Sequence, residues 1–301
     1  QVYDETLVTA SSTTAMATGT FRILPEMYSV MPEDGTVGTV VTISGSGYGA
    51  NDLVTIAFGT NDIIQQVFAT SNGSFSTTFT VDVQQYGTTT ITANGMSSAV
   101  NIFFIQPQVV SVLPTLGTVG TVVTVSGTGY AANDSITVAF GTNATIQTAA
   151  ASSYGSWTSG FTVDVQRYGT TTIIVSGAVA VASNVFVIQP QVVSVVPTQG
   201  SVGTVVTIAG TGYAVGEAVT VAFGTNATIQ TAAASSNGSW TSGFMVDVQR
   251  YGTTTIIVSG AVAVAGNVFF IQPQVVSVLP TLGTVGTVIT ISGTGYVANE
   301  A

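Results

Sequence analysis

The chain has 301 residues, of which 46% are apolar and only 5% are charged, and its formal net charge is −10. Soluble proteins usually carry about 25% charged residues. With three arginines, no lysine and no histidine, the chain has no basic patch for nucleic acid or for an anionic membrane surface. The absence of cysteine excludes disulfides, thiolate metal sites and a cysteine nucleophile.

No membrane span is expected, although the mean hydropathy is positive. The most apolar stretch, residues 170–196, is interrupted by Ser, Asn, Gln and Pro, whereas a spanning helix needs about 18 consecutive apolar residues. The chain begins at Gln1 without a signal peptide. We therefore expect either that a signal peptide was removed or that the sequence is an excerpt.

Proline spacing predicts an internal repeat of 82 to 83 residues. The first prolines of the four copies are Pro25, Pro107, Pro190 and Pro273. A second proline follows each of them seven residues later, and segments such as "FGTN", "VDVQ" and "YGTTTI" recur with the same spacing. The complete repeats are predicted at 25–106, 107–189 and 190–272.

Both ends of the chain match parts of the same repeat. Residues 1–24 align without a gap to 166–189, which predicts the C-terminal (F–G) strands of a partial repeat. Residues 273–301 match the beginning of a repeat and are predicted to form its N-terminal (A–B) strands. We expect either a longer array or an open unit that receives strands from a neighbour.

Within each repeat, alternating hydrophobicity predicts about seven antiparallel strands and no helix. In "SITVAF", for example, Ile136, Val138 and Phe140 fall on one face of the strand. The strands of the second repeat are predicted at 108–113, 119–126, 135–140, 144–151, 156–165, 170–176 and 183–188. Seven short strands in about 83 residues are typical of an Ig-like sandwich. Because the junctions lack a Gly/Ser linker, we expect an all-β chain of tandem Ig-like antiparallel β-sandwiches arranged as an extended rod.

The start of each repeat carries a family resemblance. "VVSVLPTLGTVGTVVTVSGTGY…ITVAFGT" resembles the opening of an IPT/TIG domain in its Pro-x-x-Gly, Val-Gly-Thr and Gly-Thr-Gly-aromatic elements. The resemblance extends over each full repeat and is strongest in its first 35 residues. It implies an Ig-like fold used by microbial surface proteins for display, stalks or protein contact, and it implies no single activity.

No set of catalytic, cofactor-binding or metal-binding residues is predicted, and hence no enzyme. Glu33 and Asp34 are expected to belong to a turn because their segment, "PEDG", has turn chemistry. Asp82, Asp164 and Asp247 recur once per repeat, and we expect a solvated or junction role for them, with calcium binding as the alternative. Trp157 and Trp240 alternate in phase with core phenylalanines, which favours a place in the core over a sugar-stacking platform. A tyrosine before each "GTTTI" (Tyr86, Tyr168 and Tyr251) is expected to supply a structural hydroxyl.

Two further groups of surface residues are predicted. N-glycosylation sequons, which mark surface loops of a secreted protein, occur at Asn72, Asn133, Asn143, Asn226 and Asn237. Across the repeat junctions, a glutamate appears only where an arginine precedes it, which predicts the ion pairs Arg167–Glu217 and Arg250–Glu300.

These observations favour a structural extracellular protein of the cell surface, either a stalk or a filament subunit. Its expected partners are other copies of the same chain, as a homopolymer with strand sharing or as a continuous array, with glycans possible. The alternatives are an adhesin or carbohydrate-binding array, and accessory repeats of a secreted enzyme.

Overall fold

The computed structural model describes residues 5–261 and 264–299. Within this part of the chain, all regular secondary structure is β-strand, and no helix could cross a membrane. Backbone contacts divide the chain into two compact units. Unit 1 contains residues 1–112, 124–160 and 174–184, and unit 2 contains 113–123, 161–173 and 185–301, so the boundary passes through the second repeat.

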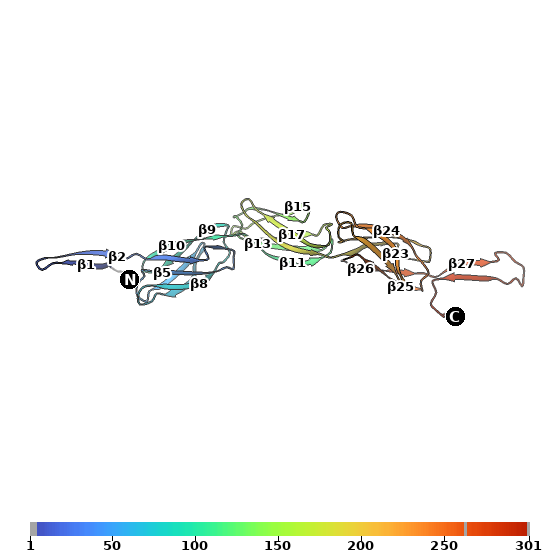
Figure 1. Ribbon diagram of the computed structural model, residues 1–301, viewed down its shortest axis with the longest axis horizontal. Helices are drawn as coiled ribbons and strands as arrows, with labels where there is room; N and C mark the ends of the chain where they lie inside the picture. Colours follow the sequence, from blue (N-terminus) through green and yellow to red (C-terminus); the bar gives the residue numbers. More distant parts are fainter. Residues whose placement is uncertain (1–4, 262–263, 300–301) are drawn as a thin grey trace. The chain divides into compact units, whose positions relative to one another are not determined.

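The first repeat lies within unit 1 and forms two sheets that pack face to face (Figure 1). Its strands are β3 (Glu26–Met31), β4 (Asp34–Gly35), β5 (Val40–Ser46), β6 (Leu53–Phe58), β7 (Asn61–Phe68), β8 (Phe75–Thr80), β9 (Gly87–Asn94) and β10 (Ser98–Ile105). One sheet has the order β3-β5-β8 and the other β4-β10-β9-β6-β7. Strand β4 pairs with β10 in parallel, and the other pairs in the two sheets whose register is known are antiparallel.

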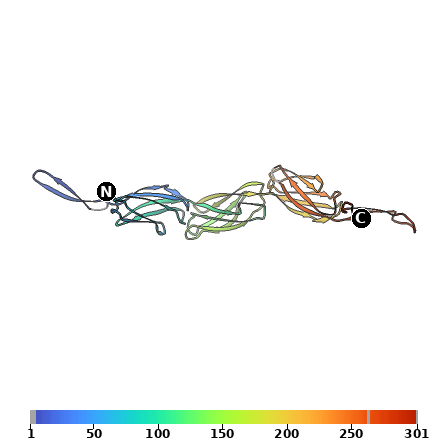
Figure 2. The ribbon, with the colours of Figure 1, turned by 90° about the horizontal axis from the view of Figure 1, so that it is seen from below.

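The same two strand orders recur in the later repeats. Figure 2 gives a second view of the ribbon. The second repeat contains β11 (Gln108–Leu113), β12 (Leu116–Gly117), β13 (Val122–Thr128), β14 (Ser135–Phe140), β15 (Asn143–Ala150), β16 (Trp157–Thr162), β17 (Gly169–Ser176) and β18 (Val181–Ile188). The third contains β19 (Gln191–Val196), β20 (Gln199–Gly200), β21 (Val205–Thr211), β22 (Ala218–Phe223), β23 (Asn226–Ala233), β24 (Trp240–Met245), β25 (Gly252–Ser259) and β26 (Val264–Ile271).

Each sandwich has a core built from the alternating strand residues. In the third repeat, Val219, Val221 and Phe223 of β22 are fully buried, while the residues between them are partly exposed. The ring of Phe223 lies 5.1 Å from that of Phe244 in the opposite sheet, measured between centroids. Burying one such side chain contributes about 1.5–3 kcal/mol, so the buried faces of the strands supply a large favourable contribution to folding.

A buried tyrosine lies at the end of the second long strand of each repeat. The hydroxyl of Tyr48 donates to the carbonyl of Ala93 (3.1 Å), and those of Tyr130 and Tyr213 donate to the equivalent carbonyls, Val175 and Val258 (both 3.3 Å). These three tyrosines belong to the "GSGY" and "GTGY" motifs. They supply the buried structural hydroxyls, whereas Tyr168 and Tyr251, before "GTTTI", are 38% and 49% exposed.

Each end of the chain forms a two-stranded hairpin. Strand β1 (Glu5–Ser11) pairs with β2 (Met16–Arg22), and β27 (Gln274–Leu279) pairs with β28 (Thr290–Thr294) with the same bulge that β19 and β21 show. Their apolar faces are exposed: Phe21 is 60% exposed and Ile291 66%, whereas the equivalent Phe186 and Ile208 of complete repeats are fully buried.

Candidate functional site

The connections between successive repeats are the most regular feature outside the cores. Only Gln106 and Pro107 lie between β10 of the first repeat and β11 of the second. The Gln106 amide donates to the carbonyl of Gly35 (2.7 Å), and Gln189 and Gln272 make the same bond to Gly117 and Gly200 (2.7 and 2.8 Å). The backbone therefore remains hydrogen-bonded to each repeat as it leaves it, and no Gly/Ser linker follows.

A glutamine after the junction proline adds a second link. The Gln108 side chain, on the first residue of β11, donates from Nε2 to the carbonyl of Val37 in the preceding repeat (2.8 Å). Gln191 and Gln274 donate to Val119 and Val202 at the same distance. The corresponding residue of the first repeat is Glu26, whose side chain has no N–H to donate. Sequence reasoning missed this role, although the Pro-Gln-Val-Val sequence at all three junctions was a visible signal.

A third contact joins the segment before "GTTTI" to the next repeat. The amide of Tyr86 donates to the carbonyl of Tyr130 (3.0 Å), and that of Tyr168 to Tyr213 (3.2 Å). At the first junction, Gln85 Nε2 also donates to the carbonyl of Ser153 (3.0 Å). At the first junction, these bonds place the β8–β9 connection against the turns that follow β13 and β15 of the second repeat.

The glutamate predicted to cross the junction makes bonds within its own repeat. Glu217 is 8% exposed, and its Oε2 accepts the amide of Ala214 (2.7 Å). In the first two repeats, Asp52 and Asp134 accept the amides of Met96 and Ala178 (both 2.9 Å), in the turn between β9 and β10 and between β17 and β18. The acid at this position therefore stabilises loops of its own repeat, and the Arg167–Glu217 pair stays a prediction.

The second predicted pair, Arg250–Glu300, cannot be placed because Glu300 lies outside the described residues. Arg250 lines a hollow of about 370 Å³ together with Val248 and Tyr296. The backbone of Arg167 lies against the turn at Gly238, where an added Cβ would come within 2.8 Å of the Arg167 Cα. Both arginines are thus next to the strand-connecting segments of the following repeat or hairpin.

The repeated aspartates take part in a polar network inside each repeat. Asp247 accepts the side-chain amides of Asn226 (3.0 Å) and Gln249 (2.8 Å), and Asp82 accepts those of Asn61 and Gln84 (both 2.9 Å). In Asp82 and Asp247, both carboxylate oxygens are engaged by neutral amides of the "FGTN" and "VDVQ" segments. Both residues are partly exposed, and the expected solvated or junction role stays a prediction. In residues 5–261 and 264–299, no three or more His, Cys, Asp or Glu side chains are grouped to hold a metal ion.

The predicted sequons divide into two environments. Asn72 and Asn237 are exposed in the turns between β7 and β8 and between β23 and β24, and Asn133 is exposed with a φ of 57° in the turn before β14. Asn226 is partly buried, with its Nδ2 bound to Asp247 and its Oδ1 accepting the amide of Thr228 (3.1 Å). Asn143 has the corresponding position in the second repeat and is also partly buried.

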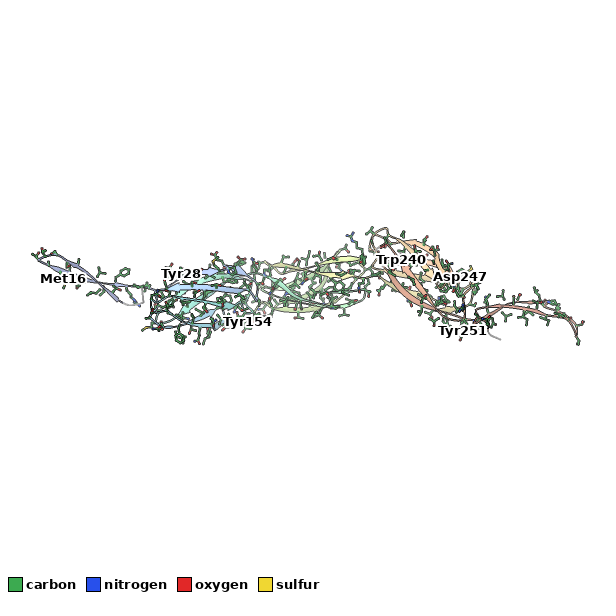
Figure 3. The ribbon with its side chains drawn as sticks, turned by 60° about the horizontal axis from the view of Figure 1, so that its bottom comes forward. Met16, Tyr28, Tyr154, Trp240, Asp247 and Tyr251 are labelled. Atoms are coloured by element: carbon green, nitrogen blue, oxygen red, sulfur yellow. The ribbon has the colours of Figure 1, made fainter. Side chains whose placement is uncertain are left out.

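The tryptophans lie in the core, as predicted. Trp157 and Trp240 are both 4% exposed, and their rings meet the buried Tyr130 and Tyr213 edge to face at 6.0 and 5.9 Å. Figure 3 labels Trp240 on its strand in the third sandwich. These rings are therefore unavailable for stacking on a sugar.

The "PEDG" segment differs from the expected turn. Asp34 begins strand β4, and the carbonyl of Glu33 accepts the amide of Phe104 (3.0 Å) in β10. The chain crosses from one sheet to the other at this point. Both acidic side chains line a hollow beside β3 and β10.

No protein-family model and no curated protein matches the chain. Solved structures with similar folds include a complex with a xylogluco-oligosaccharide (18% identity, TM-score 0.30, 82% of this chain and 60% of that one). Another is a tetra-tandem repeat from the extending region of a large adhesion protein (19% identity, TM-score 0.27, 84% of this chain and 75% of that one). A third is invasin, a bacterial integrin-binding protein (13% identity, TM-score 0.27, 86% of this chain and 62% of that one). The chain thus spans three fifths of the first of these structures. Its own sheets and strand orders define it as an all-β protein of tandem Ig-like sandwiches.

Proposed function

We propose that the protein is a structural, extracellular tandem-repeat protein that forms a stalk or a filament on a cell surface. The observation that carries this proposal is the junction, where a two-residue connection and a glutamine link recur in the same geometry. A stalk keeps a defined length only if the connections between its repeats are ordered, whereas a flexible tether does not need ordered connections. Successive repeats would then extend the chain as a rod.

Two features of the surface support a non-enzymatic role. Asp82 and Asp247 have both carboxylate oxygens bound by side-chain amides, and the chain lacks histidine, cysteine and lysine. A general acid or base needs a group whose protonation changes near the working pH. We therefore propose that no repeat is catalytic, and that a link to a secreted enzyme would be that of an accessory region.

The function can be tested by measuring the order of a junction. Asp62→Cys and Ala144→Cys place single thiols at equivalent exposed positions of the first two repeats, and the chain has no other cysteine. Spin labels at these sites should give one narrow distance distribution by pulsed electron paramagnetic resonance. A broad distribution, as from a flexible linker, would contradict the proposal. Antibody labelling of intact cells would test the surface location separately.

We further propose that copies of the chain share strands. The β1–β2 hairpin corresponds to β25 and β26 of a complete repeat, and β27–β28 corresponds to β19 and β21. Val8 and Ile291 are 57% and 66% exposed, whereas their equivalents Ile256 and Ile208 are fully buried in one core. Pairing the two hairpins from different copies would cover both faces, as in β-strand addition.

A disulfide trap tests strand sharing. A chain with Val8→Cys and Ile291→Cys should form covalent oligomers under mild oxidation, while each single variant should stop at the dimer. A matched double variant with Ser11→Cys and Thr290→Cys, on exposed positions outside the proposed core, controls for random collision. A Val8→Cys/Ile291→Cys chain that stays monomeric, or that forms no more covalent oligomers than the control, would refute strand sharing and leave the stalk proposal standing.

We also propose that the repeats are of the IPT/TIG type, because their Pro-x-x-Gly and Gly-Thr-Gly-aromatic elements resemble those of that family. The last glycine of the Gly-Thr-Gly-aromatic element is required by the backbone. In the second repeat this is Gly129, which has a φ of 76°, and a Cβ there would collide with the carbonyl of Gln106 at the junction. The alternative function, a carbohydrate-binding adhesin, is favoured by one observation only, a hollow on the first repeat.

A further inference from the structure

The first repeat contains a groove of about 600 Å³ at the edge of its sandwich. It lies where the chain leaves β3 in one sheet and enters β4 in the other, and β9 and β10 complete its wall. Ligand pockets usually have volumes of about 300–1,000 Å³. All the lining residues belong to unit 1, and the groove is therefore a feature of a single sandwich.

Three residues in which the first repeat differs chemically from the other two lie at this groove. Tyr28, Glu33 and Asp34 line it, and Tyr28 is 59% exposed on β3, where Figure 3 labels it. The second repeat has Val110, Thr115 and Leu116 at these positions, and the third has Val193, Thr198 and Gln199. The neighbouring lining residues Ser29, Val30, Thr88 and Asn101 are identical in all three repeats. At these three positions the first repeat has an aromatic ring and two carboxylates, whereas the other repeats have apolar or neutral side chains.

The framework holds these groups in place. Asn101 Nδ2 donates to the carbonyl of Met27 (3.1 Å), which joins β10 to β3 across the groove. Asp34 Oδ2 accepts the side-chain amide of Gln106, and Asp34 pairs with Phe104 in the parallel ladder. The ring of Phe104 lies edge to face with that of Tyr86, 5.4 Å between centroids.

We propose that this groove binds a short, neutral oligosaccharide. An exposed tyrosine offers an apolar face for the C–H groups of a sugar ring and a hydroxyl at its tip. Carboxylates accept hydrogen bonds from hydroxyl groups, and such charge-assisted bonds are about twice as strong as neutral ones. A chain with a net charge of −10 and two carboxylates at the groove repels uronic acids, sulfated sugars and phosphates.

Titration of the whole chain with neutral tetrasaccharides tests the proposal. Cello-, xylo-, manno- and malto-tetraose should be added separately, with tetragalacturonate as the anionic probe. The expected result is saturable binding of at least one neutral sugar, measured by calorimetry, with at least tenfold weaker binding of tetragalacturonate. Failure of all four neutral sugars to bind at millimolar concentration would overturn the proposal.

Substitutions taken from the other repeats then locate the site. Tyr28→Val and the double variant Glu33→Thr/Asp34→Leu should each weaken sugar binding at least tenfold, and they should fold because the second repeat has these residues. Tyr154→Val removes a tyrosine that is 54% exposed on a turn of the second repeat, and it should leave the affinity unchanged. Equal affinity in the wild type and Tyr28→Val would show that the groove is not the site.

Discussion

The side chains of Gln84 and Gln249 hydrogen-bond both the backbone and the side chains of neighbouring segments. Gln249 Nε2 donates to Asp247 Oδ1 (2.8 Å) and Thr225 Oγ1 (3.3 Å), and its Oε1 accepts the amide of Thr225 (3.4 Å). Such bonds contribute about 1 kcal/mol each, and leaving a buried partner unsatisfied costs more. In a chain with few charges, neutral amides thus replace the ion pairs that fix loops in other proteins.

The buried tyrosines predict the alkaline limit of stability. Burial raises the pKa of Tyr48 to about 12, and it also raises the pKa of Tyr130 and Tyr213, with Asp134 and Glu217 adding to the effect. Their contribution to the free energy of unfolding is complete below the unfolded pKa of about 10 and is lost as the pH rises through that of the folded state. Wild-type protein should therefore lose stability between about pH 10 and 12.

Denaturant titrations across this pH range measure the effect. A variant with Phe in place of Tyr48, Tyr130 and Tyr213 should be less stable near neutral pH by about 1 kcal/mol for each lost hydroxyl bond. Its stability should also fall less steeply above about pH 10. Tyr154→Phe, at an exposed position, should behave as wild type. The same alkaline slope in the triple variant would show that these tyrosines do not set the limit.

The polar network predicts which sequons accept a glycan. In a host that glycosylates secreted proteins, Asn72, Asn133 and Asn237 should be modified and Asn226 should remain bare, because its Nδ2 is bound to Asp247. Asn61 makes the same bond to Asp82 in the first repeat, where "NDI" is not a sequon, which argues that this asparagine is kept for the hydrogen bond. Asn143, at the same position in the second repeat, should also remain bare.

Peptide mass spectrometry measures the occupancy of each sequon. Asp247→Ala should release the Asn226 side chain and raise its glycan occupancy, with Asn237 as the internal control in the same repeat. High occupancy of Asn226 in the wild type would contradict the assignment.

At the scale of strands, alternation predicted most elements, and errors arose where the chain changes sheets. Strands expected at 108–113, 135–140 and 183–188 are β11, β14 and β18, the last of which starts two residues earlier. One strand was expected at 119–126, but β13 starts at Val122, and the two-residue β12 was not expected. Its pairing with β18 is parallel and far apart in sequence, so no local pattern marks it.

Side-chain partners across long sequence distances were harder to predict than strands. The sequence predicted a stiff junction between repeats, but it did not predict the glutamine link there, and the Arg167–Glu217 pair stays a prediction. Gln191 and Val119 are 72 residues apart, and their contact depends on how the chain enters the repeat. The groove at Tyr28 was also missed, because "PEDG" has the composition of a turn.

The junction glutamine is expected to limit motion between repeats. Gln191→Glu removes the donor to the Val119 carbonyl and reproduces the residue type found at Glu26. Spin labels at Ala144→Cys and Ala227→Cys should report a broader distance distribution in this variant than in the parent. Gln147→Glu is the matched control, since Gln147 donates within its own repeat to Gly160 (2.9 Å). Equal widths in all three proteins would show that the link does not restrict the junction.

At the scale of the molecule, the three repeats share one architecture but differ in their surfaces. Only the first has an exposed tyrosine and two carboxylates beside the β3–β4 crossing. The hairpins at the two ends expose residues that complete repeats bury, such as Val8 and Ile291. The proposed structural array, with the proposed ligand site on one repeat and the proposed self-association at its hairpins, would account for all three features.

Small-angle X-ray scattering of the monomeric chain tests the central claim, that ordered junctions make the repeats an extended structural array. A compact protein of 301 residues has a radius of gyration of about 19 Å. If each repeat extends the chain by on the order of 40 Å, the radius of gyration should be on the order of 40 Å, with the scattering profile of a rod. A value near 20 Å, or the profile of a flexible chain, would contradict the account.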